Sequence, residues 1–280
     1  MTSQDASSGA QDSDLPGSAA EPPPFDITVA HPARIYNYWL GGKDNYEADR
    51  EAGELAVRYN PNILPGVRAN RAFLRRAVQF LAGEAGIRQF LDIGTGLPTA
   101  ENTHEVAQAI APESRIVYVD NDPIVLAHAR ALLTSTPEGA TAYVDVDAQD
   151  TDTILRSAAQ TLDFSKPIAV MALMILQYVP DSDYPHEIVR RLMEAVPSGS
   201  YLAISDTTRD IDTERVSGTT AQLNTRMGPA RMTLRSRDEI AGFLDGLEPV
   251  DPGLVPLPQW RALASPAHVI PCYAAVARKP

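Results

Sequence analysis

The stretch that decides the fold is Gln89-Phe-Leu-Asp-Ile-Gly-Thr-Gly-Leu-Pro98, followed by Arg115-Ile-Val-Tyr-Val-Asp-Asn-Asp-Pro123. The first stretch is an apolar strand that runs into two glycines, and the second is an apolar strand that ends at Asp120. Between them the apolar residues recur at helical spacing. A strand, a glycine turn, a helix and a second strand ending in an acid form half of a nucleotide-binding α/β fold.

The alternation of strands and helices continues along the chain. Strands are expected at 89–93, 115–119, 141–146, 168–176, 201–205, 248–250 and 273–277. Helices are expected at 66–84, from 102 or 103, and at 124–133, 151–161, 185–195 and from 236. Residues 207–235 are predicted to be a polar, irregular insertion near the pocket. Seven strands alternating with helices predict a doubly wound, mostly parallel α/β sheet.

The residues before the first strand are predicted to form a tail and a cap. Residues 1–24 are rich in Ser, Ala, Asp, Gly and Pro, with few large apolar side chains, and predict a disordered tail. Residues 25–88 are predicted to be an N-terminal helical cap on the domain of residues 89–280. Aromatic residues are dense in this cap, at Tyr36, Tyr38, Trp39, Tyr46 and Tyr59. They favour either a lid over a pocket or a small helical satellite on the core.

Composition excludes several classes of protein. Hydrophobic residues make up 44% of the 280 residues, and no apolar run is long enough to span a membrane. No secretory signal is visible, so the cytoplasm is the expected location. A net charge of −12 disfavours nucleic-acid binding. Cys272 is the only cysteine, which excludes an internal disulfide and a cysteine-rich metal site, and we expect no metal.

Candidate ligand-binding residues follow the first two strands, at the sheet edge where open α/β folds bind ligands. Gly94 and Gly96 flank Thr95 and let the backbone approach a ligand closely. Asp120 could accept hydrogen bonds from both hydroxyls of a ribose. Asp92 lies two residues before the first glycine, where a buried charge is unfavourable. The negative charge of Asp92 would be stabilised either by a cationic ligand or by backbone amides of the glycine loop.

Two departures from a dinucleotide fingerprint indicate which nucleotide is bound. Thr99 stands where a third glycine is expected, and Asp92 would repel a pyrophosphate. S-adenosylmethionine has no phosphate and carries an ammonium and a sulfonium, so these residues favour it over NAD. The third strand ends at Asp145 and Asp147, and either could accept a hydrogen bond from the adenine amine. We prefer Asp147, which lies nearer the carboxyl end.

Four stretches resemble the bacterial S-adenosyl methyltransferase family, formerly a domain of unknown function. They are His31-Pro-Ala-Arg-Ile-Tyr-Asn-Tyr-Trp-Leu-Gly-Gly-Lys-Asp-Asn-Tyr46, Asn70-Arg-Ala-Phe-Leu-Arg-Arg76, Gln89-Phe-Leu-Asp-Ile-Gly-Thr-Gly-Leu-Pro-Thr99 and Val117-Tyr-Val-Asp-Asn-Asp-Pro123. The resemblance spans about residues 26–280. It implies a class I methyltransferase (Rossmann-like) fold with an antiparallel last strand, S-adenosyl-L-methionine as methyl donor and S-adenosyl-L-homocysteine as product.

The resemblance also implies which residues meet the ligand. Those implied at its methionine end are Asp92, Gly94, Thr95 and Gly96, together with the backbone of Ala172 and Leu173. Those implied at the ribose and adenine are Asp120, Asn121, Asp147 and Ala148. Those expected to reach the same cavity from the N-terminal segment are Tyr36, Tyr38, Asn70 and Arg71.

The sequence departs from the family where this fold class faces the methyl acceptor. Gln177 and Asp206 stand at positions where relatives carry histidine, so either the acceptor differs or a histidine base is missing. The candidate catalytic residues are Asp206, Gln177, Tyr178 and His31. A base is needed only if the acceptor must lose a proton.

Three functions fit these residues. We prefer an S-adenosylmethionine-dependent methyltransferase acting on a small-molecule acceptor. One alternative is a protein that binds S-adenosylmethionine as a sensor or structural protein without transferring the methyl group. The other is an NAD-dependent oxidoreductase on a similar half-fold.

Overall fold

The computed structural model describes residues 26–99, 101–125, 135–262 and 268–280. The predicted tail at 1–24 and most of the helix predicted at 124–133 lie outside these residues. The described chain forms one sheet of eight strands in the order β3-β2-β1-β4-β5-β8-β6, with β7 paired to β8. The strands are β1 Gln89–Ile93, β2 Arg115–Asp120, β3 Ala140–Asp145, β4 Ala169–Leu173, β5 Tyr201–Thr207, β6 Glu248–Pro249, β7 Val255–Pro256 and β8 Cys272–Arg278.

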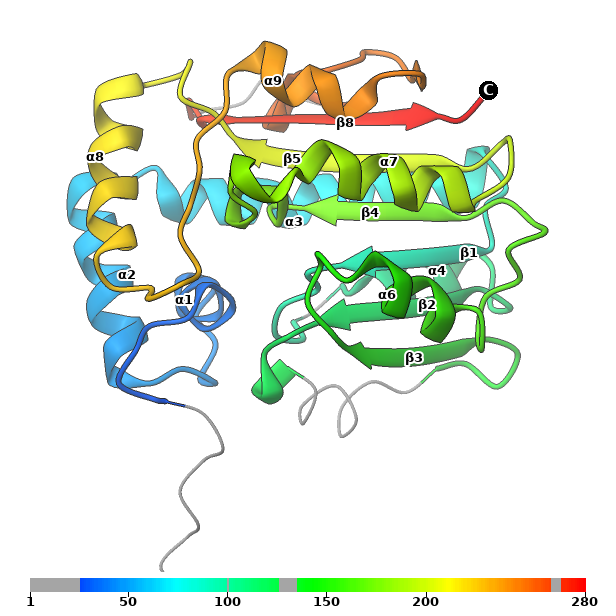
Figure 1. Ribbon diagram of the computed structural model, residues 1–280, viewed down its shortest axis with the longest axis horizontal. Helices are drawn as coiled ribbons and strands as arrows, with labels where there is room; N and C mark the ends of the chain where they lie inside the picture. The colour runs from blue at the N-terminus through cyan, green and yellow to red at the C-terminus, as the bar shows by residue number, and fades with distance from the viewer. Residues whose placement is uncertain (1–25, 100, 126–134, 263–267) are drawn as a thin grey trace, which may run out of the picture.

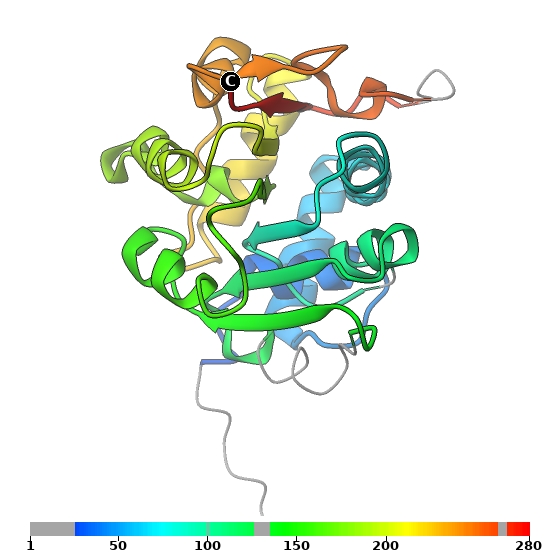
Figure 2. The same cartoon turned by 90° about the vertical axis from the view of Figure 1, so that its right-hand side faces the viewer.

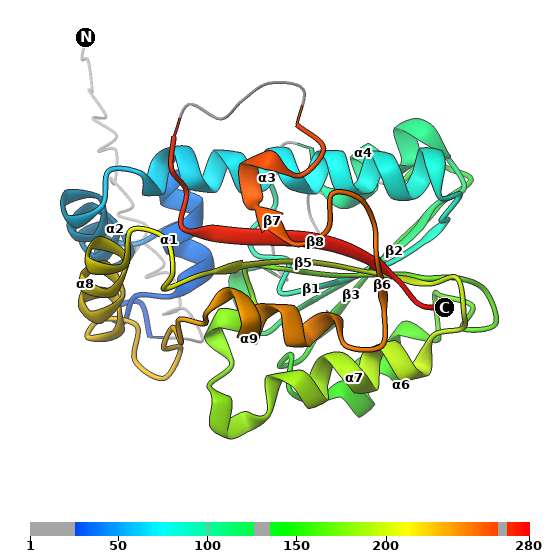
Figure 3. The same ribbon diagram turned by 90° about the horizontal axis from the view of Figure 1, so that it is seen from above.

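The sheet is doubly wound and mostly parallel, as predicted. Strand β1 pairs in parallel with β2 on one side and with β4 on the other, and β5 pairs antiparallel with β8. The antiparallel last strand confirms what the resemblance implied. Helices cover both faces, α3 and α4 on one and α6, α7 and α9 on the other (Figure 3). The additional strand, β7, was not predicted; it has two residues and lies in a proline-rich segment.

The helices predicted to begin at 66, at 102 or 103, and at 151, 185 and 236 begin within three residues of those positions, and three further helices were not predicted individually. The principal helices of the described chain are α1 Pro32–Trp39, α2 Glu47–Tyr59, α3 Ile63–Gln79, α4 Thr103–Ile110, α6 Thr151–Ala158, α7 Pro185–Ala195, α8 Thr213–Asn224 and α9 Arg237–Ala241. Within the predicted cap segment, α1 and α2 lie beyond the carboxyl ends of the parallel strands, where α8 joins them (Figure 1). Seen from the opposite end of the sheet in Figure 2, these helices lie behind it. None of the helices in the described residues is long and apolar enough to cross a membrane.

Two predicted elements differ from the structure. The prediction that residues 207–235 are irregular is wrong, because they contain α8, which packs on α2. Strand β4 ends at Leu173 although the apolar run continues to Leu176. The chain turns at Met174, whose φ of 59° is incompatible with a strand. Hydrophobicity alone cannot mark that turn.

The core lies on both sides of the sheet, so β1 is buried on both faces. Leu91 and Ile93 pack in the layer that includes residues of α6 and α7, whereas Phe90 packs with residues of α3. Because strand residues alternate, Asp92 shares the face of Phe90 and points toward α4. The alternation therefore aims one carboxylate of an apolar strand at the start of a helix.

Candidate functional site

A cavity of about 790 Å³ opens at the carboxyl ends of the parallel strands. It lies beside β1, whose neighbours β2 and β4 extend the sheet in opposite directions, which is the switch point where α/β sheets bind ligands. The loops after β1, β2 and β4 form its floor, and α1, α3 and α8 contribute its walls. Its size is in the upper part of the usual range for ligand pockets, about 300–1,000 Å³.

Most of the predicted site residues line this cavity. Those that do are His31, Tyr36, Asn70, Arg71, Asp92, Gly94, Thr95, Gly96, Asp120, Asn121, Asp147, Ala148, Leu173, Gln177 and Tyr178. Three do not: Tyr38, Ala172 and Asp206. The Tyr38 hydroxyl turns outward and donates to Glu54 Oε1 at 3.2 Å, and Ala172 packs in the apolar layer on the other face of β4. The prediction for Tyr38 is wrong, because its side chain points away from the cavity. The prediction for Ala172 concerns its backbone, so the direction of its side chain leaves it a prediction.

The glycine loop has the backbone shape that its sequence predicts. Gly94 and Gly96 have positive φ values of 69° and 67°, which residues with a side chain rarely adopt. A Cβ on Gly94 would lie 2.7 Å from Ile175 Cβ, whereas a Cβ on Gly96 would meet nothing within 4 Å. Gly94 is therefore required for packing against the loop after β4, and Gly96 leaves open space on the cavity side.

We expect Gly94→Ala to lower the free energy of unfolding by about 1–3 kcal/mol more than Gly96→Ala. Both variants place a side chain at a positive φ, at about 1 kcal/mol each, but only the first also forces Ile175 to move. Urea denaturation of both variants without ligand measures the difference. Equal losses would mean that Ile175 moves aside freely.

Asp92 is a buried acid that faces the cavity. Its Oδ2 accepts a hydrogen bond of 2.6 Å from Thr103 Oγ1 at the first turn of α4. Burial raises the pKa of Asp92 to about 6, although the Thr103 hydroxyl and the charge of Arg71 oppose this shift. The raised pKa means that the surrounding groups do not fully stabilise the negative charge of the carboxylate. A cation bound beside it would therefore be stabilised.

Asp120, at the end of β2, is held by the backbone on both carboxylate oxygens. Gly96 N donates to Oδ2 at 2.7 Å and Asp122 N to Oδ1 at 3.0 Å. Each oxygen keeps a second lone pair for a ligand hydroxyl. Burial raises the pKa of Asp120, against the lowering effect of these two amides.

The adenine end of the predicted site is formed by two neighbouring side chains. Asn121 Nδ2 donates to Asp147 Oδ2 at 2.8 Å, and both residues line the cavity. Asp145, the alternative to Asp147, is exposed and does not line it. The geometry thus favours the preferred acid of the pair.

Polar side chains connect α1 to the segment after β2 and to α2. His31 Nδ1 lies 2.9 Å from Asp122 Oδ2, and Arg34 Nε lies 3.4 Å from Asp49 Oδ1. Burial alone would raise the pKa of Asp122, but the hydrogen bond and charge of His31 lower it on balance. The candidate catalytic residue His31 is thus engaged in holding the cap.

A chain of neutral hydrogen bonds forms the wall between α3 and β5. Asn70 Nδ2 donates to Tyr36 Oη at 3.1 Å, and Ser205 Oγ donates to Asn70 Oδ1 at 2.8 Å. Burial raises the pKa values of Tyr36 and Tyr178 to about 12. Both phenols therefore stay protonated at neutral pH, and Tyr178 cannot be a base there.

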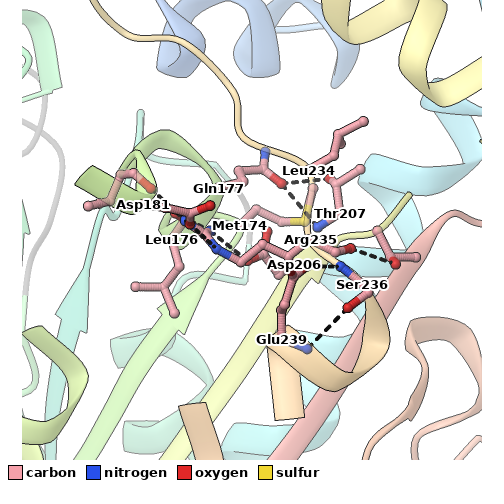
Figure 4. Close-up of polar contacts among 12 residues, drawn as sticks. Met174, Leu176, Gln177, Asp181, Asp206, Thr207, Leu234, Arg235, Ser236 and Glu239 are labelled. Carbon is pink, nitrogen blue, oxygen red and sulfur yellow. Dashed lines mark hydrogen bonds and ion pairs between the residues drawn. The ribbon is translucent and has the colours of Figure 1, made fainter. Parts of the chain in front are cut away.

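Asp206, a candidate catalytic acid or base, is fully buried and does not line the cavity. It lies beside Arg235 (Figure 4). Its Oδ2 lies 3.5 Å from Arg235 Nη1. Burial raises the pKa of Asp206 to about 7, although Arg235 lowers it. Gln177 is directed to Thr207, whose Oγ1 donates to Gln177 Oε1 at 2.6 Å. The prediction that Asp206 contacts the acceptor is corrected, because its side chain is fully buried and does not line the cavity.

Sequence reasoning missed the side of the cavity formed by α8 and the segment after it. The lining residues there are Val216, Thr219, Thr220, Leu223, Met227, Pro229, Ala230 and Met232. The spacing of the first five is helical and was a usable signal. Two threonines at the centre of this row of residues made the apolar pattern weaker. Among the described residues, no group of His, Cys, Asp or Glu has the arrangement of a metal site.

Comparisons with known proteins agree with this geometry. A family model for S-adenosyl methyltransferases matches residues 18–280. The structure of a DUF574 family protein from Streptomyces avermitilis is 48% identical with a TM-score of 0.88, covering 91% of this chain and all (100%) of that one. A Thermobifida fusca protein provisionally described as a methyltransferase is 37% identical with a TM-score of 0.85, covering 94% of this chain and 99% of that one.

A more distant comparison shows only the fold. The plantazolicin methyltransferase BpumL is 10% identical with a TM-score of 0.53, covering 89% of this chain and 95% of that one. Among curated proteins, none matches the chain.

Proposed function

The chain belongs to the S-adenosyl methyltransferase family and is an S-adenosylmethionine-dependent methyltransferase, and on that premise we propose that it methylates a small molecule bound in the cavity beside β1. The observation that carries the proposal is the buried carboxylate of Asp92 in that cavity, whose negative charge is not fully stabilised. An ammonium and a sulfonium are the charges that such a carboxylate would favour. Gly96 adds open space in the same loop, so the residues present fit this ligand.

We assign the residues of the cavity to the parts of the ligand as follows. Asp92 and the loop of Gly94, Thr95 and Gly96 bind its methionine end, with Asn70, Arg71 and Leu173 beside them. Asp120 accepts the ribose hydroxyls through its free lone pairs. Asn121, Asp147 and Ala148 bind adenine. What supports this assignment is that all of these residues line one cavity.

When bound, S-adenosylmethionine supplies an electrophilic methyl group whose leaving thioether is neutral and needs no acid. The protein contributes alignment of the acceptor with that methyl group and exclusion of water. Tyr36, Tyr178 and Cys272 line the cavity, and burial raises the pKa of each to about 12. Because these groups keep their protons, they cannot deprotonate the acceptor.

Isothermal titration calorimetry with S-adenosylmethionine, S-adenosylhomocysteine and NAD tests the proposed ligand. We expect the first two to bind and NAD not to bind, since its pyrophosphate would face Asp92. Release of S-adenosylhomocysteine in the presence of an acceptor then distinguishes an enzyme from a sensor. Binding of NAD alone would overturn the proposal.

The affinity for S-adenosylmethionine is expected to fall as the pH is lowered through about 6. The pKa of Asp92 is raised to about 6 in the free protein, so below that value a bound cation must displace a proton. One proton displaced corresponds to a loss of up to about tenfold per pH unit. Calorimetry between about pH 5 and pH 8 measures it. A flat profile would show that Asp92 does not interact with the ligand's charge.

A further inference from the structure

One end of the cavity is an apolar compartment, which we call the acceptor chamber. Its residues line the cavity and pack in a single apolar cluster, and they are Trp39, Ile63, Tyr178, Leu223, Met227 and Met232. They come from α1, α3, the turn after β4, α8 and the segment that follows α8. The chamber is thus built mainly by the elements that lie beyond the carboxyl ends of the strands (Figure 1).

In the segment 213–232, the charged residues do not face the cavity. None of its eight lining residues is charged. Its charged residues are all exposed, and they are Glu214, Arg215, Arg226 and Arg231. The ionisable side chains of the cavity come from other segments. Asp92 and Asp120 lie in its floor, and Asp26 and Asp183 are exposed. His31 and Arg34 of α1 also line it, but they are paired with Asp122 and Asp49. A charged molecule in the chamber would therefore lose its hydration without gaining a counterion there.

The hydroxyl and thiol groups next to the chamber are neutral, and the Tyr36 hydroxyl already donates to the Val67 carbonyl. Tyr36, Tyr178 and Cys272 keep their protons at neutral pH because burial raises the pKa of each to about 12. A hydroxyl acceptor that must lose its proton before attack finds no base in this wall. An uncharged aromatic nitrogen has a free lone pair without losing a proton, so it can react beside such a wall.

The chamber also has the side chains that favour flat rings. Trp39 and Tyr178 offer aromatic surfaces, and Met227 and Met232 offer thioethers, which are polarisable and adapt to irregular shapes. Thioether–ring contacts add to the burial of apolar surface.

We propose that the acceptor chamber takes an uncharged aromatic compound whose ring nitrogen or aromatic amine accepts the methyl group. The proposal rests on the proposed function of the cavity. The nitrogen lone pair forms the bond to the methyl carbon while the carbon–sulfur pair stays on sulfur. A methylated ring nitrogen retains the positive charge that sulfur has lost, whereas a methylated amine releases a proton to water.

The test uses the full chain saturated with S-adenosylhomocysteine and four two-ring probes of similar size. These are quinoline, 2-naphthol, 2-naphthoate and 2-naphthylmethylammonium, titrated calorimetrically at neutral pH. We expect quinoline and 2-naphthol to bind at least about tenfold more tightly than the two ions. With S-adenosylmethionine in place, mass spectrometry should detect N-methylquinolinium and no methylated naphthol. Equal binding of the ions, or methylation of naphthol alone, would overturn the proposal.

A pair of variants on neighbouring residues of α8 locates the probes. Thr220 lines the cavity, whereas Ala221 is exposed. Thr220→Glu should weaken quinoline binding by about tenfold or more and strengthen binding of 2-naphthylmethylammonium, while Ala221→Glu should change neither. The gain in cation binding cannot come from misfolding. If Thr220→Glu binds S-adenosylhomocysteine normally and leaves all four probes unaffected, the chamber assignment fails. If the unmodified chain does not bind S-adenosylhomocysteine at all, the proposed function fails instead.

Discussion

Asp92→Asn is expected to weaken binding of S-adenosylmethionine by about 30-fold or more. The substitution keeps the size of the side chain and its acceptor for Thr103 but removes the negative charge. Removing one member of a buried charge pair costs about 2–5 kcal/mol, which corresponds to that loss of affinity. The effect should be large because Asp92 is 6% exposed and little water can replace the missing charge. Calorimetry with the purified variant measures it.

Two comparisons show what the Asp92 charge does. Thr103→Val removes only the hydrogen bond to Asp92 and should weaken binding less than Asp92→Asn. S-adenosylhomocysteine lacks the sulfonium, so a smaller loss for this ligand would place the carboxylate near the sulfur, and an equal loss would place it near the ammonium. The loss of affinity below about pH 6 should also become smaller in Asp92→Asn. Unchanged affinity for both ligands would mean that Asp92 only accepts the hydrogen bond from Thr103 at the start of α4.

The floor of the cavity could be predicted because it depends on residues close together in sequence. The run 89–96 contains the strand, the acid and both glycines, and the positive φ values of Gly94 and Gly96 follow from residue type. Asp120 was placed by the same logic, as the residue that ends an apolar strand. In each case the local pattern and the position in a parallel sheet are sufficient.

The roof of the cavity could not be predicted in the same way. Helix α8 contains threonines, which favour helix weakly, and it is stabilised by packing on α2 rather than by its own sequence. The direction of Tyr38 depends on Glu54, one helix away. Asp206 was judged by its place at a strand end, but its surroundings are set by Arg235, which lies 29 residues later. Such contacts between distant segments leave no periodic signal.

Arg235→Met is expected to lower the free energy of unfolding by about 3–5 kcal/mol, the usual effect of breaking a buried ion pair. The Arg235 side chain is 1% exposed, and its guanidinium joins the turn after β4 to the end of β5 (Figure 4). Its Nη1 donates to the Leu176 carbonyl at 2.8 Å and its Nη2 to the Val179 carbonyl at 2.7 Å. Methionine fills similar volume but leaves both carbonyls without these donors. Urea denaturation measures the loss.

The pH dependence of that loss separates the ion pair from the carbonyl bonds. The pKa of Asp206 is raised to about 7, so below that pH its carboxyl is mainly neutral in the folded protein and gains little from the charge of Arg235. Above it, the carboxylate is ionised only because Arg235 is present. Arg235→Met should therefore destabilise the protein more at about pH 8.5 than at about pH 6. The increase should disappear in the double variant Arg235→Met/Asp206→Asn.

Arg237→Met is the matched control, because this arginine lies two residues further along and its side chain is 51% exposed. It should change the stability by less than about 0.5 kcal/mol at either pH. If Arg235→Met is no worse than this control, the guanidinium does not hold the two segments together. If its loss is large but independent of pH, the carbonyl bonds and the ion pair with Asp181 account for it, and Asp206 does not contribute. A pH-dependent loss that Asp206→Asn abolishes would instead identify Asp206 as the buried counterion of Arg235, which is the role that its buried position beside Arg235 predicts.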